Sequence, residues 1–229
     1  MIKEQLDTEE IVLIVRKLVE ASTRDGYGGP FDGLVLVGGC ALCMHEIRES
    51  SGDVDLYAPR RIAEQAPELA EELRAGYGSH FSIDVTTDNR LWGQVKVADI
   101  DKSPVARHFE VDGHKVELRS LTPETVFILK AEAGRDKDID DLEVIARHTT
   151  PEAIVERWRQ MIPHNDPGMV PGITSNLFGE ICAQYLCEFD PAWLDGMQMR
   201  SREKDEILAG FGRTESRRAS PARHAGAHP

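Results

Sequence analysis

The most constraining stretch of this sequence is residues 34–56, where two β-prone runs flank a short helical segment. The first run is apolar and ends in Gly38 and Gly39, and the second carries Asp53 and Asp55. Side chains alternate along a strand, so we expect both acids on one face and their apolar neighbours on the other. The pattern predicts a strand–turn–helix–strand unit with an acidic face.

Two carboxylates on one strand face repel each other, and this repulsion costs stability unless a cation neutralises them. Mg²⁺ is the cation that the pattern favours, because it binds carboxylate oxygens and substrate phosphates together. The glycines stand where a strand passes into a helix, so their backbone can approach a phosphate closely. We therefore expect a magnesium and phosphate site at this turn.

Two upstream residues extend the pattern, because Arg48 and Ser51 precede the acids as R-x-x-S-x-D-V-D-L. An apolar strand, two glycines, a helix and Asp-x-Asp together resemble the nucleotidyltransferase superfamily with the DNA polymerase β type of fold. Cys40 departs from this resemblance, since the superfamily usually has Ser or Thr there. The resemblance implies an α+β fold, with a nucleotidyltransferase-like mixed β-sheet flanked by helices and a helical C-terminal portion.

A second segment, residues 121–145, contains the run Arg135-x-Lys137-Asp138-x-x-Asp141-Leu142. This run resembles the R-x-K-D-x-x-D-L element of AbiEii/MenT-type nucleotidyltransferases, which are toxins of bacterial toxin–antitoxin systems. The resemblance implies an enzyme that uses Mg²⁺ to transfer NMP from an NTP to an acceptor hydroxyl, here a tRNA 3′ end. It also implies a cognate antitoxin as partner.

The resemblance assigns roles to individual residues. By it, Asp53 and Asp55 hold Mg²⁺, Lys130 offsets charge on the phosphates, and Asp141 orients Lys130 or the nucleotide. The candidate catalytic residues are Asp53, Asp55, Lys130 and Asp141. The candidate nucleotide-binding residues are Gly38, Gly39, Arg48 and Ser51, and the candidate metal ligands are Asp53, Asp55 and Asp84.

The third acid has two candidates. Chemistry with two metal ions needs another carboxylate, since bridging acids hold the metals roughly 3.5–4 Å apart. Asp84 in FSIDV fits by strand face and chain order, and Glu117 in KVEL is the alternative. Either residue could instead be an ordinary solvated position on a strand.

Lys130 lies on an otherwise apolar helix face, where a lysine is rare without a partner. Contact with phosphates is one interpretation, and a surface lysine with a buried stem is the other. An unbroken helix would place Lys130 about 16 Å from Asp141, so their pairing requires a break near Gly134. The alternatives in this stretch are Lys137 as the phosphate ligand and Asp138 or Asp140 as the acid.

Hydrophobic periodicity and turn residues predict the order of elements. Pro67 is expected to bend or divide a helix, and Asp112-Gly113 predicts a two-residue hairpin turn. Thr122 and Thr150, each followed by proline, predict helix starts. The expected helices are 4–21, 41–47, 60–77, 123–133, 139–147, 153–161 and 174–187, and the expected strands are 34–37, 53–57, 80–86, 94–98, 106–111 and 114–118.

Composition predicts how the chain is divided. We expect a nucleotidyltransferase catalytic domain over residues 1–120 and a helical domain over residues 121–212, with a Pro/Gly loop at 165–172. Residues 213–229 are rich in Ser, Arg, Ala and Pro and have little to bury, which predicts a disordered tail.

Charge and hydropathy exclude some classes of protein. The net charge of −13 argues against a globally basic surface for bulk nucleic-acid binding, although a local basic cleft could still contact RNA. No apolar stretch approaches the roughly 20 residues that span a bilayer. The polar, acidic start MIKEQLDTEE lacks a signal-peptide core. We therefore expect a cytoplasmic protein without a membrane partner.

Cys40 and Cys43 form a C-x-x-C pair, which in other contexts indicates redox chemistry or zinc. No second pair at a suitable spacing completes a zinc site, so packing of small thiols in a helix is the favoured interpretation. Two functions compete with the toxin hypothesis. One is nucleotide transfer to a small molecule such as an aminoglycoside, and the other is a catalytically degenerate nucleotidyltransferase fold that only binds.

Overall fold

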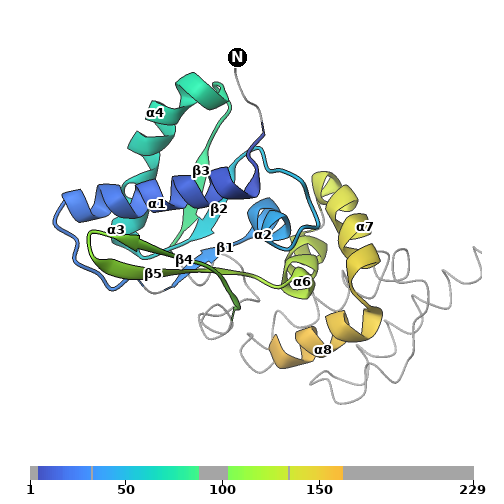
Figure 1. Ribbon diagram of the computed structural model, residues 1–229. Helices are drawn as coiled ribbons and strands as arrows, with labels where there is room; N and C mark the ends of the chain where they lie inside the picture. Colours follow the sequence, from blue (N-terminus) through green and yellow to red (C-terminus); the bar gives the residue numbers. More distant parts are fainter. Residues whose placement is uncertain (1–4, 32, 88–102, 134, 162–229) are drawn as a thin grey trace, which may run out of the picture.

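The computed structural model describes residues 5–31, 33–87, 103–133 and 135–161 (Figure 1). Helical segments and single strands alternate up to residue 86, the two strands of a hairpin follow, and the described chain ends in consecutive helices. The strands are β1 (Leu34–Leu36), β2 (Val54–Tyr57), β3 (Ile83–Thr86), β4 (Val105–Val111) and β5 (His114–Ser120). The helices are α1 (Thr8–Arg24), α2 (Gly38–Met44), α3 (Arg60–Ala63), α4 (Ala66–Tyr77), α6 (Pro123–Ala133), α7 (Ile139–His148) and α8 (Pro151–Met161), with a 3₁₀ turn η1 (Asp136–Asp138) before α7.

The five strands form one mixed sheet in the order β3-β2-β1-β5-β4. β1 runs antiparallel to β2 and parallel to β5, and β3 runs parallel to β2. α3 and α4 make the crossover that two parallel neighbours require. The predicted α+β fold with a mixed sheet flanked by helices is therefore confirmed.

α1 packs on the face of the sheet that holds the core, and α4 lies against β3 (Figure 1). The capping box between Asp7 and Glu10 fixes the start of α1, because each side chain accepts a backbone N–H of the other residue. The predicted start at residue 4 is therefore too early. Ile14 and Leu18 on the buried side of α1 belong to the same hydrophobic core as Val54 and Leu56 of β2 and Ile83 of β3.

Several predicted features are confirmed with small shifts at their ends. Pro67 lies in the first turn of α4, so the predicted helix 60–77 is divided into α3 and α4. The hairpin turn is formed by Asp112 and Gly113, both with positive φ. β1 ends at Leu36, one residue early, because Val37 already caps α2. β3 begins at Ile83, three residues later than predicted, because Phe81 N–H donates to Gly78 O in a turn.

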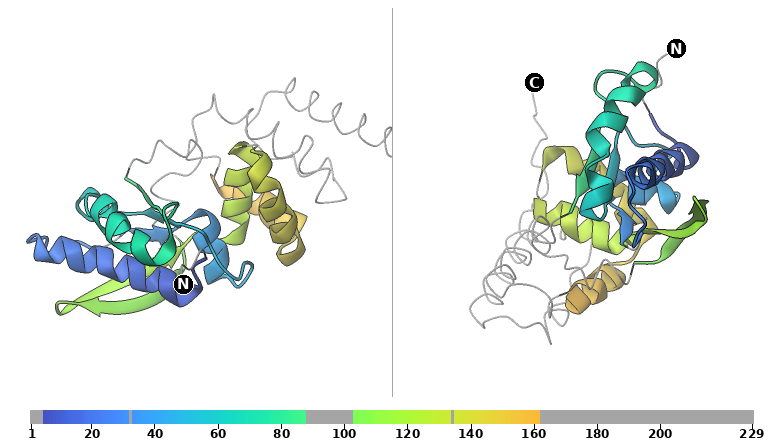
Figure 2. Two further views of the ribbon diagram at one scale, coloured as in Figure 1. Left: turned by 90° about the horizontal axis from the view of Figure 1, so that it is seen from above. Right: turned by 90° about the vertical axis from the view of Figure 1, so that its left-hand side faces the viewer.

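The helices at the end of the described chain form a separate layer beside the sheet. α6 packs against α2, and both α7 and α8 pack against α6, as Figure 2 shows from two further directions. Thr122 and Thr150 accept backbone N–H groups at the starts of α6 and α8, as predicted. α6 ends at Ala133 and η1 begins at Asp136, so the helix is interrupted between them.

Other predictions fall outside the described residues. They are the strand at 94–98, the loop at 165–172, the helix at 174–187, the tail at 213–229, and Gly134. The division of the chain at residues 120 and 212 therefore stays a prediction. Within the described part of the chain, no helix has both the length and the apolar character needed to cross a membrane.

Candidate metal and nucleotide site

Three carboxylates meet on the face of the sheet opposite α1. Asp55 on β2 and Asp84 on β3 are direct partners in the parallel register. Asp53 lies two residues before Asp55, so alternation turns it to the same face. One oxygen from each of the three lies within 4.8 Å of the others. We call Asp53, Asp55 and Asp84 the acid cluster.

The pKa of Asp55 in the acid cluster lies well above its ordinary value. Burial raises the pKa of Asp55, the charges of Asp53 and Asp84 raise it further, and Lys130 and Lys137 offset part of the rise, leaving a pKa of about 7. Three hard oxygen donors that repel one another fit a divalent cation such as Mg²⁺ by their chemistry. The cluster could therefore hold a metal ion.

Gly38 and Gly39 start α2 directly beside these acids. Gly38 has a φ of +52°, and a Cβ there would lie 2.5 Å from Asp55 Oδ2. A Cβ on Gly39 would lie 3.0 Å from Ser51 Oγ and 3.1 Å from Arg48 Nη1. Glycine at both positions lets the helix start approach the acidic strand, because no side chain separates them.

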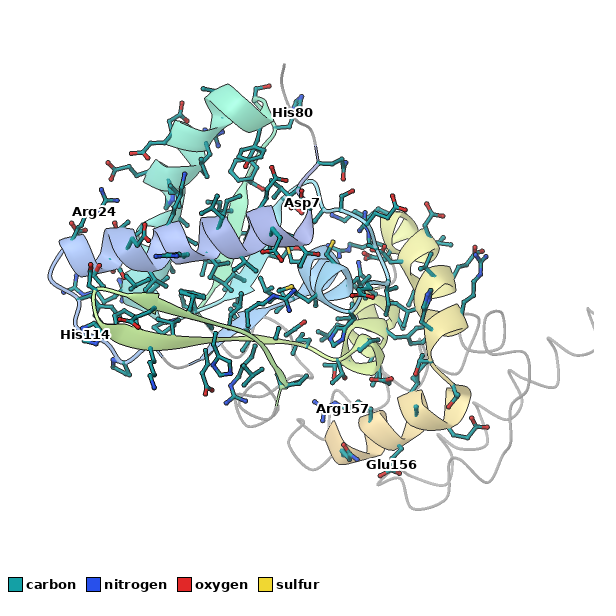
Figure 3. All side chains as sticks on the ribbon, viewed as in Figure 1. Asp7, Arg24, His80, His114, Glu156 and Arg157 are labelled. Carbon is teal, nitrogen blue, oxygen red and sulfur yellow. The ribbon has the colours of Figure 1, made fainter. Side chains whose placement is uncertain are left out.

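Ser51 sits beneath the acid cluster and not on the surface. It is 2% exposed, and its hydroxyl donates to Asp53 Oδ1 at 3.3 Å. Ser51 and Leu6 also exchange two backbone hydrogen bonds, Leu6 N to Ser51 O and Ser51 N to Leu6 O, at 2.7 and 2.9 Å. Figure 3 labels Asp7 at this end of α1, with Arg24 at the opposite end. The segment before α1 thus holds the loop that leads into the acids.

Lys130 lies between two carboxylates. Its Nζ is 2.7 Å from Asp138 Oδ1 and 2.7 Å from Asp141 Oδ2, and its side chain is only 10% exposed. Asp141 also pairs with Arg48 at 3.2 Å, and Asp138 pairs with Arg135 at 2.6 Å. We call Arg48, Asp141, Lys130, Asp138 and Arg135 the charge chain, because opposite charges alternate along it.

The interruption after α6 makes this pairing possible. Lys130 is on α6 and Asp141 is on α7, and the 3₁₀ turn between them carries Asp138. Asp138 is 2% exposed. Burial alone would raise the pKa of Asp138, but hydrogen bonds from Arg135 and Lys130 outweigh it and hold the pKa below its usual value.

The alternative residues from the sequence lie in different surroundings in the structure. Among the described residues, the acidic group that could hold a metal includes Asp84 and not Glu117, which pairs with Arg119 at 2.8 Å. Asp140 is exposed at the start of α7. Lys137 is exposed, no ion pair for it is found within the described residues, and its charge acts on Asp55. With Lys130, it is one of two cations whose charge lowers the pKa of Asp55.

From the sequence, Asp138 is only an alternative acid, and Arg135 has no role of its own. The sequence does contain a signal for the pairing of Arg135 with Asp138, because an aspartate three residues after an arginine on a turn can pair with it. The lysine partner of Asp138 comes from the preceding helix, and the sequence alone does not show how that helix turns back. The C-x-x-C cysteines are buried free thiols, and no metal-holding group with a cysteine occurs in the described ranges.

Comparison with known families supports a relationship to nucleotidyltransferases. Residues 95–164 match a family described as "Nucleotidyl transferase of unknown function (DUF2204)". The match covers less than a third of the chain and contains β4, β5 and the helices that carry Lys130, Asp138 and Asp141. The search of curated proteins found no match to this chain.

Proposed function

We propose that this protein is a Mg²⁺-dependent nucleotidyltransferase that transfers NMP from an NTP to an acceptor hydroxyl. One observation carries the proposal, namely the convergence of Asp53, Asp55 and Asp84 beside the turn where Gly38 and Gly39 begin α2. The family match supports it from a separate part of the chain, residues 95–164.

In this proposal the acid cluster holds Mg²⁺, which when bound neutralises phosphate charge and lowers the pKa of the acceptor hydroxyl. The N–H groups of Gly38 and Gly39 face the triphosphate, since the first N–H groups of a helix lack helical partners. Lys130 supplies positive charge that acts on Asp55, and Asp138 and Asp141 hold its ammonium in place. The acceptor oxygen attacks the α-phosphorus, and pyrophosphate leaves.

The acceptor that we propose is the 3′ end of tRNA, with a cognate antitoxin as the protein partner. This part rests on the resemblance of residues 135–142 to the AbiEii/MenT element. The cations of the charge chain would contact RNA at one defined site and do not form a broad basic surface, because Arg48, Lys130 and Arg135 are each paired with an acid. A small-molecule acceptor is the competing outcome.

The test incubates the protein with each labelled NTP, MgCl₂ and total tRNA, and repeats the reaction with Asp53→Ala. Label on RNA that disappears in Asp53→Ala supports the full proposal. Asp140→Ala is the matched control, because it removes an exposed acid outside the acid cluster. Its transfer rate should stay within about twofold of wild type, as surface substitutions away from a site usually do little.

Two other results would change the conclusion. Label found only on small molecules would replace tRNA as the acceptor but keep the transferase. Absence of transfer to any acceptor, together with absence of NTP binding in calorimetry, would overturn the enzymatic proposal and leave a binding module.

A further inference from the structure

Cys40 is the residue at which this chain departs from the superfamily pattern, and its thiol touches the backbone of the acidic strand. The side chain is fully buried in the first turn of α2. Its Sγ lies 3.2 Å from the carbonyl oxygen of Asp53 and 3.4 Å from the backbone nitrogen of Asp55. Both distances fall within the range for hydrogen bonds to sulfur.

These two backbone groups need such a partner because the ladder between β1 and β2 stops here. Val37 N–H still donates to Asp55 O at 3.1 Å, but Val37 O accepts the first helical bond from Ala41 N–H, also at 3.1 Å. The carbonyl that would have received Asp55 N–H has therefore turned into α2. Buried backbone groups are nearly always paired, and Asp55 N–H donates to the Cys40 sulfur instead.

The thiol can serve both groups because a cysteine side chain offers a weak S–H donor and a weak sulfur acceptor at the same atom. The S–H donates to Asp53 O, and a sulfur lone pair accepts from Asp55 N–H. One side chain thereby connects the start of α2 to both residues that bracket Val54.

We infer that Cys40 is a positioning residue for the acid cluster, holding the backbone of Asp53 and Asp55 at the separation that a divalent cation needs. The inference rests on the metal site of the proposed function and deepens it. The two carboxylates leave the chain at the same residues whose N–H and C=O the thiol binds, so loss of the thiol would let both side chains drift. Groups that orient metal ligands typically change metal affinity about 10–100-fold when removed.

The test measures Mn²⁺ affinity by EPR titration of the full chain without nucleotide, for wild type, Cys40→Ala, Cys40→Ser and Cys43→Ala. Cys43 is the matched control, because it is also buried in α2 and loses the same atom. Cys40→Ala should weaken Mn²⁺ binding about tenfold or more. Cys43→Ala should lower Tm comparably but leave the Mn²⁺ affinity within about twofold, since it removes packing alone.

Cys40→Ser keeps a donor and an acceptor at the same position, so it should bind Mn²⁺ within about threefold of wild type. If Cys40→Ala does not fold, Cys40→Ser provides the test. A loss of tenfold or more in the Mn²⁺ affinity of Cys40→Ser would overturn the inference. Equal losses in Cys40→Ala and Cys43→Ala would also overturn it. Wild-type protein that binds no Mn²⁺ would refute the metal site and the proposed function together, whereas Mn²⁺ binding without nucleotidyl transfer would refute only the proposed activity.

Discussion

Asp55 and Asp138 are both withdrawn from solvent, yet their pKa values move in opposite directions. Asp55 lies among like charges in the acid cluster, and its pKa rises to about 7. Asp138 lies between Lys130 and Arg135 in the charge chain, and its pKa falls. The charge chain pairs each of its carboxylates with a cation of the protein, whereas Lys130 and Lys137 offset only part of the repulsion within the acid cluster. Excess negative charge of this kind is typical of a site that binds a cation.

The largest expected effect on stability comes from breaking the charge chain. Asp138→Asn removes the carboxylate that pairs two cations, and loss of one partner from a buried pair costs about 3–5 kcal/mol. Arg135 is half exposed and Lys130 keeps Asp141, so we expect the lower end, about 3 kcal/mol, in the free energy of unfolding from urea denaturation. Asp140→Asn, at an exposed position, should change it by less than about 0.5 kcal/mol. Equal effects would contradict the comparison.

The pH dependence of stability tests the acid cluster itself. The pKa of Asp55 is about 7 in the folded protein, against the ordinary aspartate value of 3.8 that the unfolded chain recovers, so folding retains a proton between these values. Stability therefore falls as pH rises from about 4 to about 7, and metal-free protein should lose about 2.5 kcal/mol between pH 5 and pH 8. Urea denaturation in EDTA at pH 5 and pH 8 measures this loss.

Two comparisons sharpen that measurement. Asp55→Asn should remove most of the slope between pH 5 and pH 8, because it removes the titrating group. MgCl₂ added to wild type should restore stability at pH 8 far more than at pH 5. A slope that is unchanged in Asp55→Asn would assign the pH dependence to other groups.

Gly38→Ala tests whether the close approach of α2 to Asp55 matters. The alanine Cβ would meet Asp55 Oδ2 at 2.5 Å with φ at +52°, so both the backbone and the acid must shift. We expect a loss of about 2 kcal/mol in the free energy of unfolding, together with weaker Mn²⁺ binding. Gly76→Ala is the control, because nothing lies within 4 Å of its Cβ, and this helical position should gain up to about 1 kcal/mol.

The smallest effect on stability is expected at Arg48, which links the charge chain to the start of α2 beside the acid cluster. Arg48 is adjacent to Gly39 and pairs with Asp141 at 3.2 Å, but its side chain is 37% exposed. Arg48→Gln should therefore cost only about 1 kcal/mol in thermal or urea denaturation. Arg60→Gln removes a more exposed arginine with an i,i+4 partner and should cost less than about 0.5 kcal/mol. A larger cost for Arg60→Gln would show that exposure does not rank these pairs.

Local chemistry explains what could be predicted from the sequence. Alternation along β2 placed Asp53 and Asp55 on one face, and Asp112-Gly113 specified the hairpin because only a few residues tolerate two positive φ angles in a row. Capping threonines indicated the starts of α6 and α8. Each of these signals lies within a few residues of the feature that it specifies.

Contacts between distant segments could not be predicted in the same way. The pairing of Leu6 with Ser51 and of Lys130 with Asp138 depends on how loops return, and no periodicity encodes that. The sequence marked Cys40 only as a departure from a pattern. Its role became visible when the structure showed which backbone groups the end of β1 leaves without a sheet partner.

The pairing of Asp55 with Asp84 also bears on how the chain reaches its native state. Because side chains alternate, a slip of one residue between β2 and β3 would send Asp84 to the α1 side and bring its apolar neighbour out. A misaligned sheet could then not assemble the three oxygens. If the acid cluster binds a divalent cation as proposed, that cation would stabilise only molecules whose β2 and β3 are correctly aligned.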